Sequence, residues 1–250
     1  MKDDVEMPSE SLEVSIVIPS YNEESNLSDL LTGVLKEMSG LGKDFEIVVT
    51  DDGSVDQSWL ILKQFALKDK RVRIQRLHTR CGQSVATWAG VLVCRGKYIV
   101  TLDADLQNDI QDISKLLSFL PRYDFVCGSR AKSRSLGDSR RRIASSKIAN
   151  WLRNKLLVGN FSDSGCSLRA FKGECIQKIK FFKGAHRFLP DLFKMEGFSV
   201  REVDVVSKPR LSGKSHYGIR NRIVTTLIDL FGVWWLKRRL LVYKLSEKIN

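Results

Sequence analysis

Short apolar runs alternate with segments whose apolar residues recur every three or four positions over the first hundred residues of the chain. The short runs are rich in β-branched residues and predict strands, at 14–18, 45–50, 72–77 and 98–102. The periodic segments predict helices, from 27 to 38, 57 to 67 and 83 to 94. Such an alternation predicts a mostly parallel sheet with helices on both faces, an α/β fold.

The pattern is less regular in the second half of the chain. It predicts helices over 116–120, 143–158, 173–180 and 186–195, and extended segments over 125–127, 168–171 and 199–206. Two glycine-containing loops, 130–142 and 208–217, are basic and have no apolar periodicity. Residues 221–243 predict an amphipathic helix or a pair of helices.

This organisation predicts one main domain over residues 13–220 of the 250, with residues 1–12 disordered before it. Residues 221–250 are interpreted as amphipathic membrane-interface helices, because Trp234 and Trp235 precede Lys237, Arg238 and Arg239. Packing of the same apolar residues on the protein's own core, or on a dimer partner, is the alternative. The longest apolar stretch, 223–236, is interrupted by Asp229, and the acidic N-terminus predicts no signal peptide.

Composition narrows the classes of partner. The net charge of +12 indicates a polyanionic partner, such as nucleic acid, an anionic membrane surface or a phosphorylated substrate. The five cysteines are odd in number and have no CxxC spacing, which argues against disulfides and a zinc site and favours a reducing compartment.

Two carboxylates, Asp103 and Asp105, follow the strand at 98–102 and are separated only by Ala104. Side chains at i and i+2 of an extended segment point the same way, and ligands of open α/β sheets bind at the carboxyl ends of strands. Hard oxygen ligands of this kind suit Mg²⁺ or Mn²⁺ held jointly with the phosphates of a substrate. A lone Asp-x-Asp triplet also fits a helix cap beside a solvated acid.

Polar loops follow three of the predicted parallel strands, at 19–23, 51–54 and 103–105, and should therefore meet at one edge of the sheet. A nucleotide needs an aromatic or apolar surface for its base, a carboxylate for its donors and a metal for its phosphates. Tyr21, Asp52 and the Asp103/Asp105 pair supply these three. Taken singly, Tyr21 also fits a packing role and Asp52 a turn.

These motifs resemble the inverting glycosyltransferases of family 2, which have the GT-A fold, and within them most closely the polyprenyl- or dolichyl-phosphate sugar synthases. The resemblance covers about residues 14–220 and is carried by ordered segments, VIPSYNEE (17–24), VTDDGSVD (49–56), LDADLQ (102–107), GSR (128–130), SDSGCSLR (162–169) and RLSGKSHYG (210–218). The segment GAHRFLP (184–190) is similar to bacterial members that supply lipid-linked sugars to the cell envelope.

The resemblance implies roles for the matching positions. Those around the nucleotide sugar would be Pro19, Tyr21, Glu23, Thr50, Asp52, Asp103, Ala104, Gln107, Arg210 and His216. Asp103 and Asp105 would bind the metal, and the catalytic residues would be Asp105, Arg130 and Arg141, the two arginines meeting the phosphate of the acceptor lipid. His216 departs from the family, which usually has lysine there, and Lys214 is the alternative cation.

The resemblance thus predicts transfer of a hexose or amino-hexose from a UDP- or GDP-sugar to a polyprenyl phosphate, with Mg²⁺ or Mn²⁺ as cofactor. It places the protein in the cytoplasm, peripherally bound to an anionic membrane surface on the inner face, with a homo-oligomer left open. The first alternative is a family 2 enzyme acting on a soluble glycan or protein. The second is an α/β module that binds nucleic acid, for which Asp103 and Asp105 have no evident use; nucleic acid is therefore not the expected partner.

Overall fold

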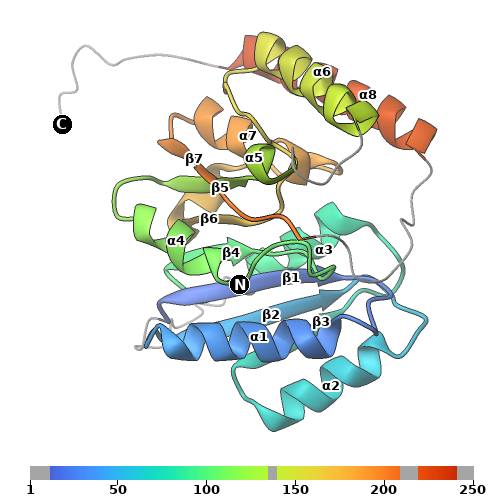
Figure 1. The fold of residues 1–250 in the computed structure, drawn as a ribbon, viewed down its shortest axis with the longest axis vertical. Helices are drawn as coiled ribbons and strands as arrows, with labels where there is room; N and C mark the ends of the chain where they lie inside the picture. The colour runs from blue at the N-terminus through green and yellow to red at the C-terminus, as the bar shows by residue number, and fades with distance from the viewer. Residues whose placement is uncertain (1–11, 135–139, 209–218, 241–250) are drawn as a thin grey trace, which may run out of the picture.

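The computed structural model describes residues 12–134, 140–208 and 219–240, with the backbone alone described at 134, 140–147 and 219–223. It contains one mixed sheet (Figure 1). Its strands are β1 (Val14–Ser20), β2 (Phe45–Asp51), β3 (Val72–Arg76), β4 (Tyr98–Thr101), β5 (Phe125–Ser129), β6 (Arg169–Lys172) and β7 (Val200–Asp204). The α-helices are α1 (Leu27–Gly40), α2 (Ser58–Lys68), α3 (Gln83–Leu92), α4 (Asp112–Phe119), α5 (Ala131–Arg134), α6 (Arg140–Leu156), α7 (Leu189–Met195) and α8 (Ile219–Arg239). Two 3₁₀ helices complete the fold, η1 (Gly173–Lys178) and η2 (Ala185–Arg187).

The strand order is β3-β2-β1-β4-β6-β5-β7, and every neighbouring pair is parallel except those that involve β6. This confirms the predicted mostly parallel α/β sheet. Because β6 is antiparallel to both β4 and β5, those two strands still run in the same direction. The carboxyl ends of β1, β2, β4, β5 and β7 therefore lie along one edge of the sheet.

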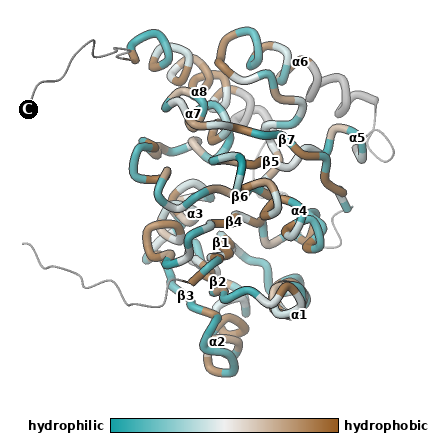
Figure 2. Tube along the Cα trace, turned by 90° about the vertical axis from the view of Figure 1, so that its left-hand side faces the viewer, coloured by the Kyte–Doolittle hydropathy of each residue, from teal (hydrophilic) through white to brown (hydrophobic). Residues whose placement is uncertain are grey.

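Helices cover both faces, as expected from the alternation in the sequence. In Figure 2, α3 and α4 lie on opposite sides of the column of strands. Alternate residues of β1 explain the two layers, because Ile16 and Ile18 join the cluster formed with α1 and α4, whereas Val17 joins the cluster with α3 and α7. Each layer buries its own apolar set, which fixes the register of the strand between them.

Two predicted helices are shorter than the pattern suggested. Residues 173–180 form only the 3₁₀ helix η1, and the helix predicted over 186–195 is divided into η2 and α7. Pro190 lies in the first turn of α7, where its missing N–H costs no hydrogen bond. A proline placed there starts a helix rather than continuing one.

The C-terminal helix α8 is one continuous helix rather than a pair, and it packs on the rest of the fold. Leu230 and Val233 are buried in the same cluster as Phe188 and Leu192. At Leu230 the alternative interpretation holds, because the side chain packs in the protein's own core rather than on a membrane-facing surface. The predicted disordered segment 1–12 lies outside the described residues except for Leu12.

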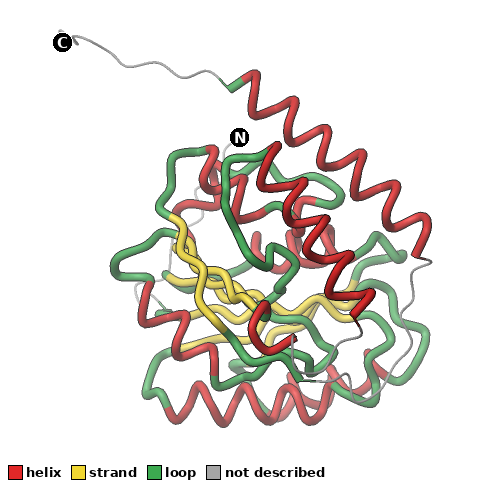
Figure 3. Tube along the Cα trace, turned by 45° about the horizontal axis from the view of Figure 1, so that its top comes forward, coloured by secondary structure: helices red, strands yellow, loops and turns green. Residues whose placement is uncertain are grey.

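α8 lies beside α6, and the two helices run in the same direction (Figure 3). The Nζ of Lys237, near the end of α8, donates to the carbonyl oxygens of Leu156 and Leu157 at 3.1 and 3.0 Å. Arg187 of η2 donates to Thr226 Oγ1 at 2.9 Å and so attaches the middle of α8 to the body. None of the helices in the described ranges combines the length and the apolarity that crossing a bilayer requires.

Candidate active site

The parallel register of β1, β2 and β4 gathers the three predicted loops at one edge. Ser20, at the end of β1, is opposite Asp51, at the end of β2. Asp52 then donates its N–H to the carbonyl oxygen of Ser20 at 2.8 Å, so the first two loops are joined directly. β4 pairs with the other side of β1, which places the Asp103–Asp105 segment beyond the same edge.

Asp52 is held by the loop that precedes α3. The backbone N–H groups of Cys81 and Gly82 donate to Oδ1 and Oδ2 of Asp52 at 2.7 and 2.8 Å. Gly82 has φ +98°, a backbone conformation that residues with a side chain rarely adopt. Glycine at this position therefore allows both N–H groups to point at one carboxylate. Asp52 is buried, and it fixes the loop of residues 79–82 against the end of β2.

The same loop reaches Tyr21. The guanidinium carbon of Arg80 lies 4.1 Å from the centre of the Tyr21 ring, a cation–π contact across the entrance of the predicted nucleoside site. The residue after Tyr21, Asn22, has φ +53° and donates its N–H to Ser54 Oγ. Tyr21 is therefore held between the β1 and β2 loops by contacts that the linear sequence did not indicate.

The other predicted nucleoside residues form the walls of this region. Thr50 is buried, and its hydroxyl accepts a hydrogen bond from Gln75 at 2.9 Å. Pro19 is opposite Thr50 in the β1–β2 register. The carboxylate of Glu23 accepts a hydrogen bond from Asn26 at 2.7 Å at the start of α1. Thr50 thus lies inside the fold rather than on an open surface.

The acidic pair lies at the end of β4. Gln83 donates from its side-chain amide to Asp103 Oδ1 at 2.7 Å, and Gln107 donates from its side chain to Asp105 Oδ2 at 2.8 Å. Both acids are partly buried, while Ala104 between them is buried in the core. Burial, followed by the negative charge of Asp105, raises the pKa of Asp103. A cation bound beside Asp103 would offset this effect of burial and of the neighbouring negative charge.

The donor set fits a divalent metal bound jointly with a substrate. Among residues 12–134, 140–208 and 219–240, no three His, Cys, Asp or Glu side chains cluster closely enough to hold a metal alone. Asp103 and Asp105 would supply two hard oxygen ligands, and a diphosphate would supply others. Bound there, such a cation supplies charge stabilisation to a departing diphosphate.

Arg130 follows β5 and is buried rather than open to solvent. Its Nε donates to Asp163 Oδ2 at 2.9 Å, and its backbone N–H donates to the same oxygen at 3.1 Å. Arg169 is buried nearby, donates to the carbonyl oxygen of Ser164 at 3.1 Å and has an Nε without a hydrogen-bond partner. Burial lowers the pKa of Arg169, and the negative charge of Asp103 is among the influences that raise it. The side chains of Arg130 and Arg169 therefore place two positive charges close enough to act on Asp103.

Three predicted site residues are not placed. Arg141 belongs to the first turn of α6, where only the backbone is described. Arg210 and His216 lie in 209–218, outside the described residues. The predicted contacts of these residues with phosphates, and the alternative role of Lys214, stay predictions.

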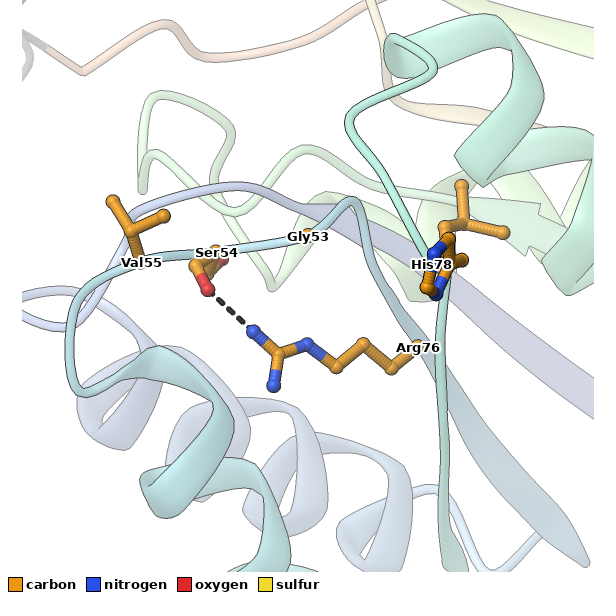
Figure 4. Close-up of a pocket in the computed structure, with 6 residues that line it drawn as sticks. Gly53, Ser54, Val55, Arg76 and His78 are labelled. Carbon is orange, nitrogen blue, oxygen red and sulfur yellow. Dashed lines mark hydrogen bonds between the residues drawn. The ribbon is translucent and has the colours of Figure 1, made fainter.

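A cavity of about 570 Å³ opens at the ends of β2 and β3, beside the Asp52 loop (Figure 4). It is lined by Gly53, Ser54, Val55, Arg76, Leu77 and His78. Arg76 closes one side by donating to the carbonyl oxygen of Ser54 at 2.5 Å and pairing with Asp51 at 3.0 Å. β4 is two strands away from β2 in the sheet, so this cavity adjoins the nucleoside side of the edge rather than the acidic pair.

Residues 15–179 match the family described as glycosyl transferase family 2, which is about two thirds of the chain. The chain belongs to glycosyltransferase family 2. The chain is therefore a glycosyltransferase, and its sheet edge, with Asp52 at one end and the Asp103/Asp105 pair at the other, is the candidate active site.

Relatives of this family 2 chain can be aligned with most of its length. It is 33% identical over 236 residues to dodecaprenyl-phosphate galacturonate synthase of Rhizobium johnstonii, covering 92% of this chain and 69% of the relative. It is 34% identical over 218 residues to undecaprenyl-phosphate 4-deoxy-4-formamido-L-arabinose transferase of Edwardsiella ictaluri, covering 87% of this chain and 66% of the relative. The chain thus spans about two thirds of the length of these relatives.

Solved structures support the fold of this glycosyltransferase. Mannosyl-3-phosphoglycerate synthase from Rubrobacter xylanophilus is similar with a TM-score of 0.69 and 17% identity, over 95% of this chain and 79% of that one. Glucosyl-3-phosphoglycerate synthase from Mycobacterium tuberculosis, solved with Mn²⁺, UDP and phosphoglyceric acid, has a TM-score of 0.66 and 19% identity, over 90% and 78%. The predicted GT-A fold is confirmed.

Four residues of this glycosyltransferase site were missed from the sequence: Arg80, Gln83, Asp163 and Arg169. Arg80 and Gln83 flank Gly82 at the start of α3, and a glycine between a strand and a helix was the available signal. Asp163 and Arg169 belong to a motif that the resemblance includes, but nothing in their spacing indicated that Asp163 pairs with Arg130 or that the charge of Arg169 acts on Asp103.

Proposed function

We propose that this glycosyltransferase moves a hexose or amino-hexose from a UDP- or GDP-sugar to a polyprenyl phosphate, with inversion at the anomeric carbon. One observation carries the proposal. Over about nine tenths of its length, this chain is 33% and 34% identical to two enzymes whose names both specify a polyprenyl phosphate. The site's residue types agree with that chemistry.

The nucleotide end of the donor fits the region between Tyr21, Arg80 and Asp52. The ring of Tyr21 and the guanidinium of Arg80 offer flat surfaces for a base or ribose, and the carboxylate of Asp52 orients the loop that carries Arg80. Asp103 and Asp105, with Mg²⁺ or Mn²⁺, fit the diphosphate at the other end. Pro19 lies near the end of β1 opposite the buried Thr50, and Glu23 lies in the loop that follows β1.

The reaction needs no general acid or base from the protein. An oxygen of the lipid phosphate, already anionic, attacks the anomeric carbon, and the bond from that carbon to the nucleoside diphosphate breaks. The electron pair leaves with the diphosphate, and no proton has to move. What the protein must supply is positive charge where two anions meet, and Arg130, Arg169, Arg141 and Arg210 are the candidates.

We further propose that the enzyme works at the inner face of the cytoplasmic membrane. Exposed apolar residues of α8 recur at helical spacing, at Val224, Leu227, Ile228, Phe231 and Trp235. The guanidinium of Arg238 lies 4.5 Å from the Trp234 ring, so cations adjoin the aromatic residues. Apolar and aromatic residues next to cations are typical of helices at anionic membrane surfaces.

The test is transfer to lipid by the purified full chain. We expect undecaprenyl phosphate, incubated with a panel of UDP- and GDP-sugars and Mg²⁺ or Mn²⁺, to gain the mass of one sugar. Asp105→Asn is the control and should form little product. Transfer to a water-soluble glycan or peptide in the absence of lipid, with none to undecaprenyl phosphate from any donor, would contradict the proposal.

A further inference from the structure

A cavity of about 330 Å³ lies between α6 and α8, well away from the nucleotide site. All the residues that line it are apolar or aromatic: Leu152, Leu156, Leu227, Leu230, Phe231 and Trp234. Leu230 is buried at its floor, whereas Leu227 and Phe231 are 49% and 62% exposed, so the cavity opens to the surface. Such walls offer no partner to a sugar, a nucleotide or a phosphate.

We propose that this cavity binds a segment of the isoprenoid chain of the lipid acceptor, several isoprene units from its phosphate. The inference rests on the proposed function, and it adds a binding site for the hydrocarbon part of that substrate. The cavity residues of α6, Leu152 and Leu156, lie about 18 Å or more past the start of that helix, so the first isoprene units stay outside the cavity. A cavity of about 330 Å³ is at the lower end of the range of small-molecule sites, about 300–1,000 Å³, so it takes a short part of a long chain.

The direction of the two helices connects the cavity to the reaction site. α6 and α8 follow the strands β5 and β7 in the chain, and both strands end at the catalytic edge. Both helices begin on the side of the molecule where those strands end and run away from it together (Figures 1 and 3). A chain lying between them would therefore extend from the catalytic edge toward the ends of the helices.

The charges on these helices agree with an anionic head and a neutral tail. The sequence of the first turn of α6, which follows the catalytic edge in the chain, is basic at 140–142. At the other end of α6, Lys237 donates to the carbonyl oxygens of Leu156 and Leu157, and the Nζ of Lys155 lies 5.2 Å from the centre of the Trp151 ring.

The exposed surface around the cavity favours a lipid occupant over a protein. Trp151 of α6 and Ile228 of α8 are exposed beside it, and they continue the apolar stripe that we propose faces the membrane. A lipid held in a bilayer could enter the cavity from that stripe without crossing water. Burial of apolar surface favours binding in proportion to its area, so even two isoprene units would be bound with useful affinity.

Leu227 and Leu60 make a matched pair for the test, because both leucines are 49% exposed on a helix, yet Leu227 lines the cavity and Leu60 lies on α2. In detergent micelles, we expect Leu227→Asn to raise the KM for undecaprenyl phosphate about 10-fold, since a leucine side chain contributes about 1.5 kcal/mol when buried. Leu60→Asn should stay within about 2-fold, and neither change should alter the KM of the nucleotide sugar. Equal effects of the two substitutions would overturn the proposal.

Photolabelling of the unsubstituted full chain gives a second readout that does not depend on the folding of a variant. An undecaprenyl phosphate analogue that carries a benzophenone several isoprene units from its phosphate should label peptides containing Leu152, Leu156 or Phe231, and undecaprenyl phosphate should compete. Labelling of other peptides overturns the proposal, and so do crosslinks between two chains that persist without lipid.

The two proposals can fail separately. If the unsubstituted enzyme transfers sugar to lipid but the probe labels other peptides, only the lipid-binding cavity is contradicted. If the enzyme transfers no sugar to lipid, the proposed function itself is contradicted.

Discussion

The side-chain amide of Gln83 donates to Oδ1 of Asp103 across 2.7 Å, and this hydrogen bond joins the start of α3 to the acidic pair at the end of β4. Gln83 follows Gly82, whose backbone N–H holds Asp52. A single turn of chain therefore contacts both the proposed nucleoside end and the proposed metal end of the site.

Gln83→Ala should weaken metal binding, because Asp103 would lose the side chain that holds it. Loss of a residue that orients a metal ligand typically lowers metal affinity about 10–100-fold. Titration of activity with Mn²⁺ should show that shift in the metal midpoint. An unaltered Mn²⁺ midpoint would show that Gln83 does not position Asp103.

Asp103→Asn and Asp105→Asn should each lower kcat about 10²–10³-fold, because each removes one anionic oxygen ligand from the cation that stabilises the leaving diphosphate. Mn²⁺ binding to each variant can be measured by calorimetry in the presence of UDP and, separately, GDP. Asp109→Asn, on the loop before α4, is a matched acid-to-amide control and should leave kcat within about 2-fold. Full activity of either pair variant at saturating metal would contradict the assignment.

Arg130 could stabilise the fold through its buried ion pair with Asp163, or it could bind the acceptor phosphate. A double substitution distinguishes the two roles. Asp163→Leu alone should destabilise the fold by about 3–5 kcal/mol, because it leaves the Arg130 charge buried without its partner. Arg130→Met combined with Asp163→Leu should recover most of that loss. If Arg130 meets the phosphate, the recovered fold will still have an acceptor KM or kcat impaired at least about 10-fold; normal kinetics would assign it to stability alone.

Asp124 should make stability depend on pH below about 4. Burial raises the pKa of Asp124, but hydrogen bonds from Lys172 and Ser199 outweigh it and lower the pKa from 3.8 to about 2. A depressed folded-state pKa stabilises the fold above the unfolded pKa, and the contribution disappears as pH falls from about 4 to about 2. Asp124→Asn should therefore lower the free energy of unfolding by about 1–2 kcal/mol at pH 7, and urea titrations should show that difference closing near pH 2.

Cys81 reports on the nucleotide site because its backbone holds Asp52 and its side chain is partly exposed. Cys127, Cys166 and Cys175 are buried, and burial raises the pKa of the Cys175 thiol to about 11. We expect N-ethylmaleimide to modify Cys81 much faster than these three, with UDP or GDP and Mn²⁺ slowing the reaction several-fold. Equal rates with and without nucleotide would place the nucleoside away from the 79–82 loop.

The sequence by itself determined the class of fold and the ends of strands where chemistry would gather. Strand-forming runs such as 14–18 and 45–50 are short, apolar and β-branched, and their alternation with helical periodicity leaves few topologies other than a parallel sheet. Asp52, Asp103 and Asp105 could be found because parallel strands end at one edge, so position in the chain predicts position in space.

The tertiary structure decided which groups support those acids, because such contacts join residues that no local pattern relates. Gln83 and Asp103 are twenty positions apart, and Arg130 and Asp163 are thirty-three apart. The tertiary structure also decided which residues of α8 are buried. Leu230 and Phe231 are adjacent and both apolar, but packing against the neighbouring helices buries Leu230 and leaves Phe231 exposed. Periodicity marks an amphipathic helix, but which element covers its apolar side is a property of the assembled fold.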